Sequence, residues 1–401
     1  MSHVVVIGAG QAGCALTAKL RNLGFDGDIT LIGEEPVPPY QRPPLSKAYL
    51  LGEMEEERLY LRPTEFYAEN GITLRLGAAV DAVDVAAKTV TVGGDVLGYD
   101  ELVFTTGSAP RRLPAAIGGD LAGVHVVRTL ADVDAMEAGF RNGAKALIVG
   151  GGYIGLEAAA VARKLGVAVT VVEMAERILQ RVACAETSDF MRALHATHGA
   201  DIREGVGLER LVGEGHVTGA VLTDGTELDV DFVIAGVGIV PGDTLAGAAG
   251  VGLDNGIATD MFGRTDVAGV WAAGDCASFP QGGAQARLES VGHAIDHAEL
   301  VAENIMGAEK TYTPRPWFWS DQYDLKLQIA GLGTGHDRVV VRETDGAVSH
   351  WYYAGDRLLA VDALNDPRSY MIGKRLIEAG KHPAPDVIAD PNTDMKALLK
   401  A

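Results

Sequence analysis

Two uninterrupted apolar runs, residues 4–7 and 146–149, open directly onto glycine-rich turns. A run without polar alternation is typical of a buried parallel strand. Each turn is followed by a stretch with helical periodicity that a glycine ends, and then by a second apolar run, at residues 29–32 and 167–172. The pattern predicts two strand–helix–strand units, one at the start of the chain and one in its middle.

Glycines stand at matching positions in the two turns. Gly150, Gly152 and Gly155 have G-x-G-x-x-G spacing, in which the first glycine permits a tight turn, the second lets a pyrophosphate approach the backbone and the third lets helix and sheet pack closely. The first turn repeats this spacing, with the residues Gly8, Gly10, Ala12 and Gly13. Both units are therefore predicted to bind a dinucleotide.

An acidic residue follows the second strand of each unit. Glu173 lies eighteen residues after Gly155, and Glu34 lies twenty-one residues after Gly13, with Glu35 as a less favoured alternative. A carboxylate at this position accepts hydrogen bonds from ribose hydroxyls and repels a 2′-phosphate. Two such sites in one chain are most simply explained by a flavin and a nicotinamide dinucleotide that exchange electrons.

The remaining pattern divides the chain further. Residues 72–104 alternate as short strands and turns, and residues 270–273 form a third apolar run that ends in Gly274-Asp275. From about residue 317, strands at 338–343, 349–353 and 357–361 and a helix at 369–379 predict an antiparallel sheet with a helix. We predict an α/β fold with four segments: residues 1–113, 114–242, 243–318 and 319–401.

A proline-rich stretch at residues 36–47 follows the first unit. Its prolines favour a stiff, extended path, and Ser46 is a candidate helix N-cap. The stretch is either a surface connector or a rigid loop that presents Arg42 and Lys47 to a polyanionic cofactor. We favour the second interpretation.

Composition narrows the classes of function. At 401 residues the chain is long enough for two or three domains, and its net charge of −20 disfavours nucleic acid and anionic membranes as partners. No 18-residue apolar run is present, and the N-terminus lacks a basic, signal-like region. The three cysteines, Cys14, Cys184 and Cys276, are isolated, which disfavours a local redox disulfide or an iron–sulfur centre and suits the cytosol.

Histidines give no clear metal signal. His293 and His297 share one helical face, and His195 and His198 are also close in sequence, but neither pair has a third ligand or an H-E-x-x-H pattern. We therefore predict no metal site.

Taken together, the segments GAGQAG, PPLSKAYL, TTGSAPR, GGGYIGLE, GDCA, LESV and PWFWSDQY resemble the FAD-dependent NADH:ferredoxin reductases of bacterial cytochrome P450 and ring-hydroxylating dioxygenase systems. The resemblance covers essentially the whole chain. It implies a glutathione-reductase-like flavoprotein whose FAD-binding domain is in two pieces around an NADH-binding domain, followed by a C-terminal α+β domain. It also implies tightly but non-covalently bound FAD, NADH as hydride donor, a [2Fe–2S] ferredoxin as partner and a monomer.

The resemblance assigns roles to individual residues. It implies a set for FAD: Gly8, Gly10, Ala12, Gly13, Glu34, Arg42, Lys47, Val80, Arg128, Asp275 and Val291. It implies a second set for NADH: Gly150, Gly152, Tyr153, Ile154, Gly155, Glu157 and Glu173. Lys47 and Glu157 are expected to form an ion pair beside the reacting rings, and Trp319 is expected near the exit of electrons.

Other functions remain open at this point. A disulfide reductase or peroxidase of the same superfamily needs a redox cysteine within residues 36–60, and none is present. An NADH oxidase that uses O₂, a rubredoxin reductase and an apoptosis-inducing-factor-like binding protein are the alternatives. Arg177 lies four residues after Glu173 and could partly offset its preference for NADH over NADPH.

Overall fold

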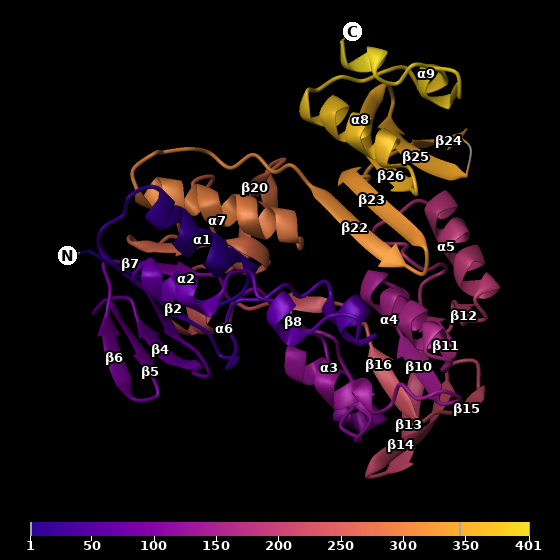
Figure 1. Ribbon diagram of the computed structural model, residues 1–401, viewed down its shortest axis with the longest axis horizontal. Helices are drawn as coiled ribbons and strands as arrows, with labels where there is room; N and C mark the ends of the chain where they lie inside the picture. The colour runs from indigo at the N-terminus through magenta and orange to yellow at the C-terminus, as the bar shows by residue number, and fades with distance from the viewer. Residues whose placement is uncertain (1, 345, 401) are drawn as a thin grey trace. The chain divides into compact units, whose positions relative to one another are not determined.

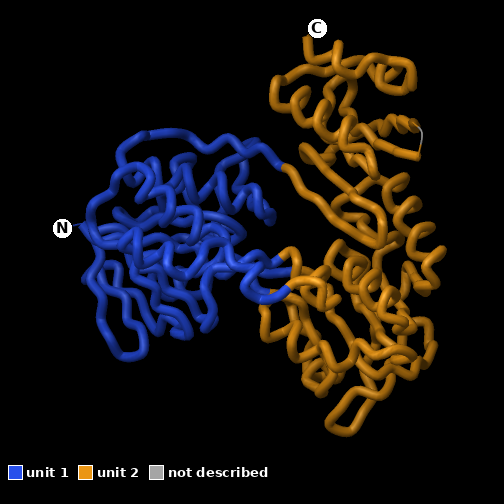
Figure 2. The backbone as a smooth tube through the Cα atoms, in the orientation of Figure 1, with its two compact units in different colours: residues 1–42, 55–109, 239–316 blue, residues 43–54, 110–238, 317–401 orange. Residues whose placement is uncertain are grey.

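The computed structural model describes residues 2–344 and 346–400. The chain forms two compact units, each assembled from three separate stretches (Figure 2). Unit 1 comprises residues 1–42, 55–109 and 239–316, and unit 2 comprises residues 43–54, 110–238 and 317–401. The proline-rich stretch therefore divides, since Arg42 ends a segment of unit 1 whereas Lys47 belongs to unit 2.

Unit 1 is built on a five-stranded parallel sheet with the order β19-β7-β1-β2-β3. Its strands are β1 (His3–Ile7), β2 (Asp28–Ile32), β3 (Ile72–Arg75), β7 (Glu101–Phe104) and β19 (Val270–Ala272). Helices α1 (Gln11–Asn22) and α7 (Val291–Ile305) lie side by side (Figure 1) and pack through α1 and α7 residues such as Leu16 and Val301. The strand order reverses at β1, which is where parallel sheets of this type bind ligands.

Smaller elements complete unit 1. They include α2 (Thr64–Glu69), α6 (Thr244–Ala248), the strand β17 (Ile239–Pro241), the antiparallel sheet β4 (Val80–Asp84), β5 (Thr89–Val92) and β6 (Asp95–Gly98), and the sheet β18 (Ile257–Ala258), β20 (Ala277–Gln281) and β21 (Ala284–Ala286). Val80 packs on the same apolar cluster as Ile32 and Phe104.

Unit 2 contains a second parallel sheet, with the order β12-β11-β10-β16-β9. Its strands are β9 (Val124–His125), β10 (Lys145–Val149), β11 (Ala168–Glu173), β12 (Asp201–Glu204) and β16 (Phe232–Ala235), and its helices are α3 (Leu130–Glu137), α4 (Tyr153–Lys164) and α5 (Ala185–Thr197). An antiparallel sheet accompanies it: β13 (Leu208–Glu214), β14 (His216–Leu222) and β15 (Glu227–Asp229).

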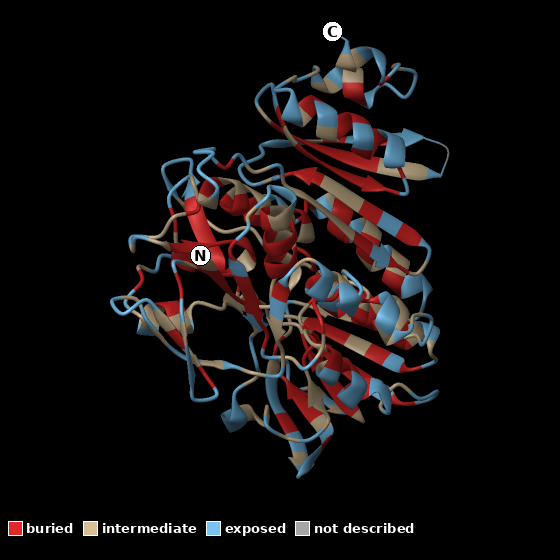
Figure 3. Ribbon diagram, turned by 60° about the vertical axis from the view of Figure 1, so that its left-hand side comes forward, coloured by how far each residue is buried: buried red, intermediate tan, exposed pale blue. Residues whose placement is uncertain are grey.

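The C-terminal part of unit 2 is an antiparallel sheet with the order β22-β23-β26-β25-β24. Its elements are β22 (Trp317–Gln322), β23 (Leu325–Gly331), β24 (Arg338–Thr344), β25 (Ala347–Ala354), β26 (Arg357–Leu364), α8 (Pro367–Glu378) and α9 (Pro385–Ala389). Trp351 and Leu376 are fully buried between this sheet and α8. Figure 3, in which red marks buried residues, shows how burial concentrates along the strands of the sheets.

The strand–helix–strand units predicted from the apolar runs are confirmed, as are the antiparallel tail and its helix. One local prediction is wrong. Ser46 does not cap a helix, because it lies inside a short helical turn, η1 (Leu45–Tyr49), whose N-cap is Pro44. Its hydroxyl is instead used in the site described below.

Candidate active site

The glycine turn after β1 is so tight that two of its positions, Gly8 and Gly13, have no room for a side chain. Gly8 has a φ of +115°, and a Cβ there would lie 2.2 Å from the carbonyl oxygen of Thr105. A Cβ on Gly13 would lie 2.2 Å from the carbonyl oxygen of Gly8. At Gly10, by contrast, a Cβ would meet no atom within 4 Å, so this side of the turn is open.

The first N–H groups of the helix that follows this turn have no partner within the helix. Gly10 is the N-cap of α1, makes no side-chain capping bond, and is followed by no acidic residue in the first helical turn. Free N–H groups and the positive end of the helix dipole attract phosphate. The turn therefore fits the pyrophosphate of a dinucleotide such as FAD, with Ala12 buried behind it.

The two acids after β2 have different surroundings. Glu35 forms an ion pair with Arg42 over 2.7 Å and accepts a hydrogen bond from the Tyr40 hydroxyl over 2.6 Å. Glu34 is exposed. This difference favours Glu34 as the ribose ligand, as the spacing predicts, and it places the Arg42 guanidinium in contact with Glu35.

The end of β19 contributes another polar side chain to unit 1. Asp275 lies in the turn after β19, and its carboxylate accepts a hydrogen bond from the Ser108 hydroxyl over 3.1 Å. Gly274, with a φ of +78°, lets this turn approach Ala12. Val291 is the first residue of α7, where a backbone N–H lacks an intrahelical partner. Their predicted contacts with FAD, and those of Val80 and Arg128, stay predictions.

The glycine turn of unit 2 reproduces the first one closely. A Cβ on Gly150 would lie 2.4 Å from the carbonyl oxygen of Gly236, and one on Gly155 would lie 2.2 Å from that of Gly150. Gly152 is again open, and it is the uncapped N-cap of α4. The following residue, Tyr153, is partly buried, whereas the Ile154 side chain is exposed.

The carboxylate of Glu173 is held by backbone donors. One oxygen accepts from the N–H of Gly151 over 2.8 Å, and the other accepts from the N–H of Ala175 over 2.8 Å. A carboxylate has further lone pairs, so it can still accept bonds from ribose hydroxyls. The geometry of this turn fits a nicotinamide dinucleotide.

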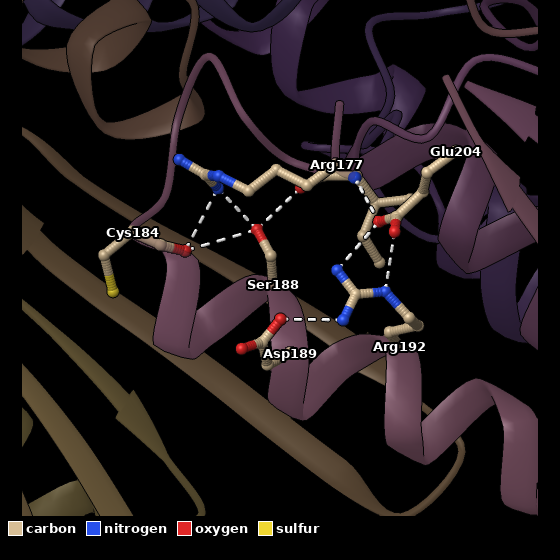
Figure 4. A network of polar contacts seen from close by, with 7 residues as sticks. Arg177, Cys184, Ser188, Asp189, Arg192 and Glu204 are labelled. Atoms are coloured by element: carbon tan, nitrogen blue, oxygen red, sulfur yellow. Dashed lines mark hydrogen bonds and ion pairs between the residues drawn. The ribbon is translucent and has the colours of Figure 1, made fainter. Parts of the chain in front are cut away.

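Arg177 is occupied elsewhere. Its guanidinium donates to the Cys184 carbonyl over 3.1 Å and to the Ser188 hydroxyl over 2.5 Å (Figure 4). The neighbouring Arg192 is bound to Glu204 and Asp189. The described contacts of Arg177 thus tie the segment after β11 to the start of α5.

Glu157, in helix α4 after the glycine turn of unit 2, forms a largely buried ion pair with Lys47. The Nζ of Lys47 is 3.0 Å from Oε1 of Glu157, and both side chains are largely shielded from solvent, with 17% and 6% of their surfaces exposed. Burial raises the pKa of Glu157, while Lys47 and two serine hydroxyls act in the opposite direction. The ion pair that we expect between Lys47 and Glu157 is therefore present in the structure.

Two serines complete the environment of Glu157, and neither was predicted from the sequence as a partner of this carboxylate. The Ser46 hydroxyl donates to Oε2 over 2.8 Å, and the Ser320 hydroxyl donates to Oε1 over 2.6 Å. Trp319, the residue before Ser320, has its ring centroid 5.9 Å from the Lys47 nitrogen. Each serine is next to a predicted site residue, Ser46 to Lys47 and Ser320 to Trp319, and this was the available sequence signal. The sequence does not show that both serines bind the distant carboxylate of Glu157.

In the part of the chain that is described, no group of three or more His, Cys, Asp or Glu side chains is placed so that it could hold a metal ion. Within the same residues, no helix is long and apolar enough to cross a bilayer. All three cysteines are buried and unpaired.

Comparisons with known proteins agree with this architecture. Residues 2–298 match the pyridine nucleotide-disulphide oxidoreductase family, and residues 317–399 match the reductase C-terminal family. The chain is 42% identical to a ferredoxin–NAD(P)+ reductase from a Sphingomonas species, across 99% of this chain and 97% of that protein. It is 39% identical to rhodocoxin reductase from Rhodococcus erythropolis, across 99% and 94% of the two chains.

A solved structure shows the same fold. The covalent putidaredoxin reductase–putidaredoxin complex contains a chain that matches with a TM-score of 0.96 and 37% identity, across 100% of this chain and 98% of that one. The family resemblance and the glutathione-reductase-like fold with its C-terminal domain are thereby confirmed. The chain belongs to the pyridine nucleotide-disulphide oxidoreductase family, and its cofactors are those of that family, FAD and NAD(P)H.

Proposed function

We propose that this protein is an NADH-dependent ferredoxin reductase, which accepts a hydride from NADH on FAD and delivers single electrons to a [2Fe–2S] ferredoxin of a cytochrome P450 or dioxygenase system. The observation that carries the proposal is the full-length likeness to ferredoxin reductases, including the reductase C-terminal part. The buried, unpaired cysteines support it, because a disulfide reductase needs an accessible redox thiol.

Each part of the proposed mechanism has residues to perform it. The flavin supplies the conversion of a two-electron donor into single electrons. The uncapped turns at Gly10 and Gly152 bind the two pyrophosphates. Glu34 and Glu173 hold the adenosine riboses, and the charge of Glu173 disfavours a 2′-phosphate.

The buried pair Lys47–Glu157 acts at the reacting end of the nicotinamide. Glu157 lies two residues after Gly155 near the start of α4, the helix that follows the glycine turn. A preorganised ammonium in a site shielded from water stabilises negative charge that develops during transfer. Glu157 holds that ammonium in place, and Trp319 lies beside it.

Substitution of Lys47 tests this role. Lys47→Ala should slow the reduction of bound flavin by NADH about a hundredfold, measured by anaerobic stopped flow, and this effect should be far larger than any loss of bound FAD. Lys164→Ala is a matched control, because Lys164 pairs with Glu53 and so joins the same two segments, but on the exposed surface. Equal reduction rates in Lys47→Ala and wild type would refute the role.

The acceptor is tested in the same apparatus. Flavin reduced with one equivalent of NADH is mixed with [2Fe–2S] ferredoxins, a rubredoxin or O₂, and cytochrome c reports the released electrons. Reduction that depends on a ferredoxin supports the proposal. Electrons that pass only to rubredoxin, or only to O₂ with stoichiometric peroxide, would instead identify a rubredoxin reductase or an oxidase.

The location and assembly of the protein belong to the same proposal. We infer a cytoplasmic monomer that meets its ferredoxin by diffusion. Size-exclusion chromatography with light scattering would give a mass of about one chain, 42.0 kDa, if the inference is right.

A further inference from the structure

A continuous line of buried polar side chains leads away from Glu157 through the apolar interior of unit 2. The Ser320 hydroxyl, bound to Glu157, lies 3.0 Å from Nε2 of Gln322. Oε1 of Gln322 lies 2.7 Å from Nε2 of His195, and Nδ1 of His195 lies 3.2 Å from the Tyr323 hydroxyl. Ser320, Gln322 and His195 are each at most 1% exposed.

Elements far apart in sequence build this line. His195 comes from α5 of the nucleotide-binding part, whereas Ser320 and Gln322 are on the inward face of β22, and Tyr323 is in the turn that follows β22. Polar groups are costly in such a position unless each one is hydrogen-bonded. Every polar atom of the Gln322–His195 contact has a partner.

The donor and acceptor of each hydrogen bond in this line can be assigned stepwise, starting from the carboxylate of Glu157. An ionised Glu157 can only accept, so the Ser320 hydroxyl donates to it and accepts from the amide of Gln322. The oxygen of Gln322 then faces His195, which must carry its proton on Nε2. Nδ1 of His195 is left to accept from the Tyr323 hydroxyl.

All four donors therefore point toward Glu157. We propose that Tyr323, His195, Gln322 and Ser320 form a polarised donor chain that keeps Glu157 ionised opposite Lys47. Hydrogen bonds aligned head to tail strengthen one another in a low-dielectric interior. The amide of Gln322 makes the chain a positioning device rather than a route for protons, because an amide does not readily release its own.

Neutral histidine is essential to this arrangement. Burial lowers the pKa of His195, and the nearby His198 acts in the same direction, whereas the hydrogen bond to Gln322 raises it. The pKa of His195 is lowered on balance, which opposes the protonation that would turn Nδ1 into a donor. Burial also raises the pKa of Tyr323 to about 12, so its hydroxyl keeps its proton, although Arg163 acts in the opposite direction. Around Glu157, the facing groups are Lys47, Ser46 and Ser320, with the Tyr153 phenol on its own helix.

The chain can be cut at successive links by substitutions that change little volume. Ser320→Ala removes the first link, Gln322→Met the second, and Tyr323→Phe the last. Ser349→Ala is a matched control, because Ser349 is equally buried in the same antiparallel sheet but bonds to Trp351.

The first readout does not require turnover. A buried carboxyl whose pKa is raised on folding stabilises the protein below the unfolded pKa, and this stabilisation is lost as the pH rises through the folded pKa. Loss of a donor raises that pKa further, so the decrease in Tm of holoenzyme Ser320→Ala should grow from pH 5 to pH 8. A decrease that is constant with pH, as expected for Ser349→Ala, would overturn the proposal.

The second readout is the tautomer of His195. Long-range ¹H–¹⁵N NMR of histidine-labelled holoenzyme should show a His195 resonance pair with Nε2 protonated and Nδ1 not, and Gln322→Met should abolish this strict preference. The pair is assigned by its disappearance in His195→Leu. A proton on Nδ1 in the wild type would reverse the chain and refute the proposal.

The third readout rests on the proposed function. The low-pH limb of the flavin-reduction rate should move upward by roughly one pH unit in Ser320→Ala, less in Gln322→Met and least in Tyr323→Phe. An unmoved limb in all three variants would contradict the donor chain. If Lys47→Ala reduces flavin at the normal rate, the role proposed for Lys47 in hydride transfer fails, yet the Tm and NMR results still decide the donor chain.

Discussion

The two nucleotide-binding turns of this chain are nearly identical in backbone and differ in what their helices carry. In both turns the first and third positions require glycine, because an added Cβ would lie within 2.4 Å of a carbonyl oxygen. At the middle glycine, an added Cβ would meet no atom within 4 Å. Two residues after the third glycine, α1 carries Ala15 whereas α4 carries Glu157. Ala15 packs with apolar neighbours, and Glu157 pairs with Lys47.

The difference separates binding from reaction. The turn alone suffices to hold a pyrophosphate, because it relies on backbone groups and the helix dipole. A buried carboxylate costs stability unless it is paired and hydrogen-bonded. Its presence in only one of two otherwise equivalent helices therefore indicates a role beyond binding, which in our proposal is hydride transfer.

The largest effects should come from the turns themselves. Gly8→Ala places a Cβ 2.2 Å from the Thr105 carbonyl oxygen at a positive φ, so FAD content should fall about tenfold or more. Gly150→Ala should leave FAD content unchanged and raise the KM for NADH about tenfold or more. Flavin absorbance per mole of protein measures the FAD content, and steady-state kinetics measure the KM for NADH. Equal loss of FAD in both variants would contradict separate roles for the turns.

The acids after the second strands should give intermediate effects. Glu173→Ala removes the charge that repels a 2′-phosphate, so the ratio of kcat/KM for NADH over NADPH should fall about tenfold. Glu34→Ala should leave this ratio unchanged and weaken FAD retention. Kinetics with both nucleotides test the pair of variants, and an unchanged ratio in Glu173→Ala would argue against its assignment.

The smallest effect concerns Arg177. Ser188→Ala removes one hydrogen bond of its guanidinium and also the bond that the Ser188 hydroxyl donates to the Ile178 carbonyl, which together should cost about 2 kcal/mol of unfolding free energy. The Cys184 carbonyl still holds the side chain, so the NADH/NADPH ratio should stay within about twofold of the wild type. A large gain in NADPH efficiency would show that a released Arg177 reaches the ribose. Chemical denaturation and the same kinetic assay give both numbers.

Much of this fold could be predicted from local sequence. The apolar runs, the glycine spacing and the terminal acids lie within thirty residues of one another, so each unit specifies itself. Arg42 and Tyr40 engage Glu35 in the structure, which supports the choice of Glu34, and the contact of Glu34 with a ribose stays a prediction.

The surroundings of Glu157 could be predicted from the sequence only in part. The family resemblance implied its pairing with Lys47, but Ser46 looked like a helix cap, and Ser320 was simply the neighbour of Trp319. Their common acceptor lies more than a hundred residues from each of them. His195 gave no signal either, because a lone buried histidine is defined by its partners, Gln322 and Tyr323, which only the folded chain brings to it.

The burial of Cys14, Cys184 and Cys276 has a practical consequence. Burial raises the pKa of each thiol, so all three should be inert toward maleimides and other alkylating probes at neutral pH. A single cysteine added at a chosen surface position would then be the sole labelling site, with no need for a cysteine-free background. Fluorophores, spin labels or crosslinkers attached in this way could map where an electron acceptor docks.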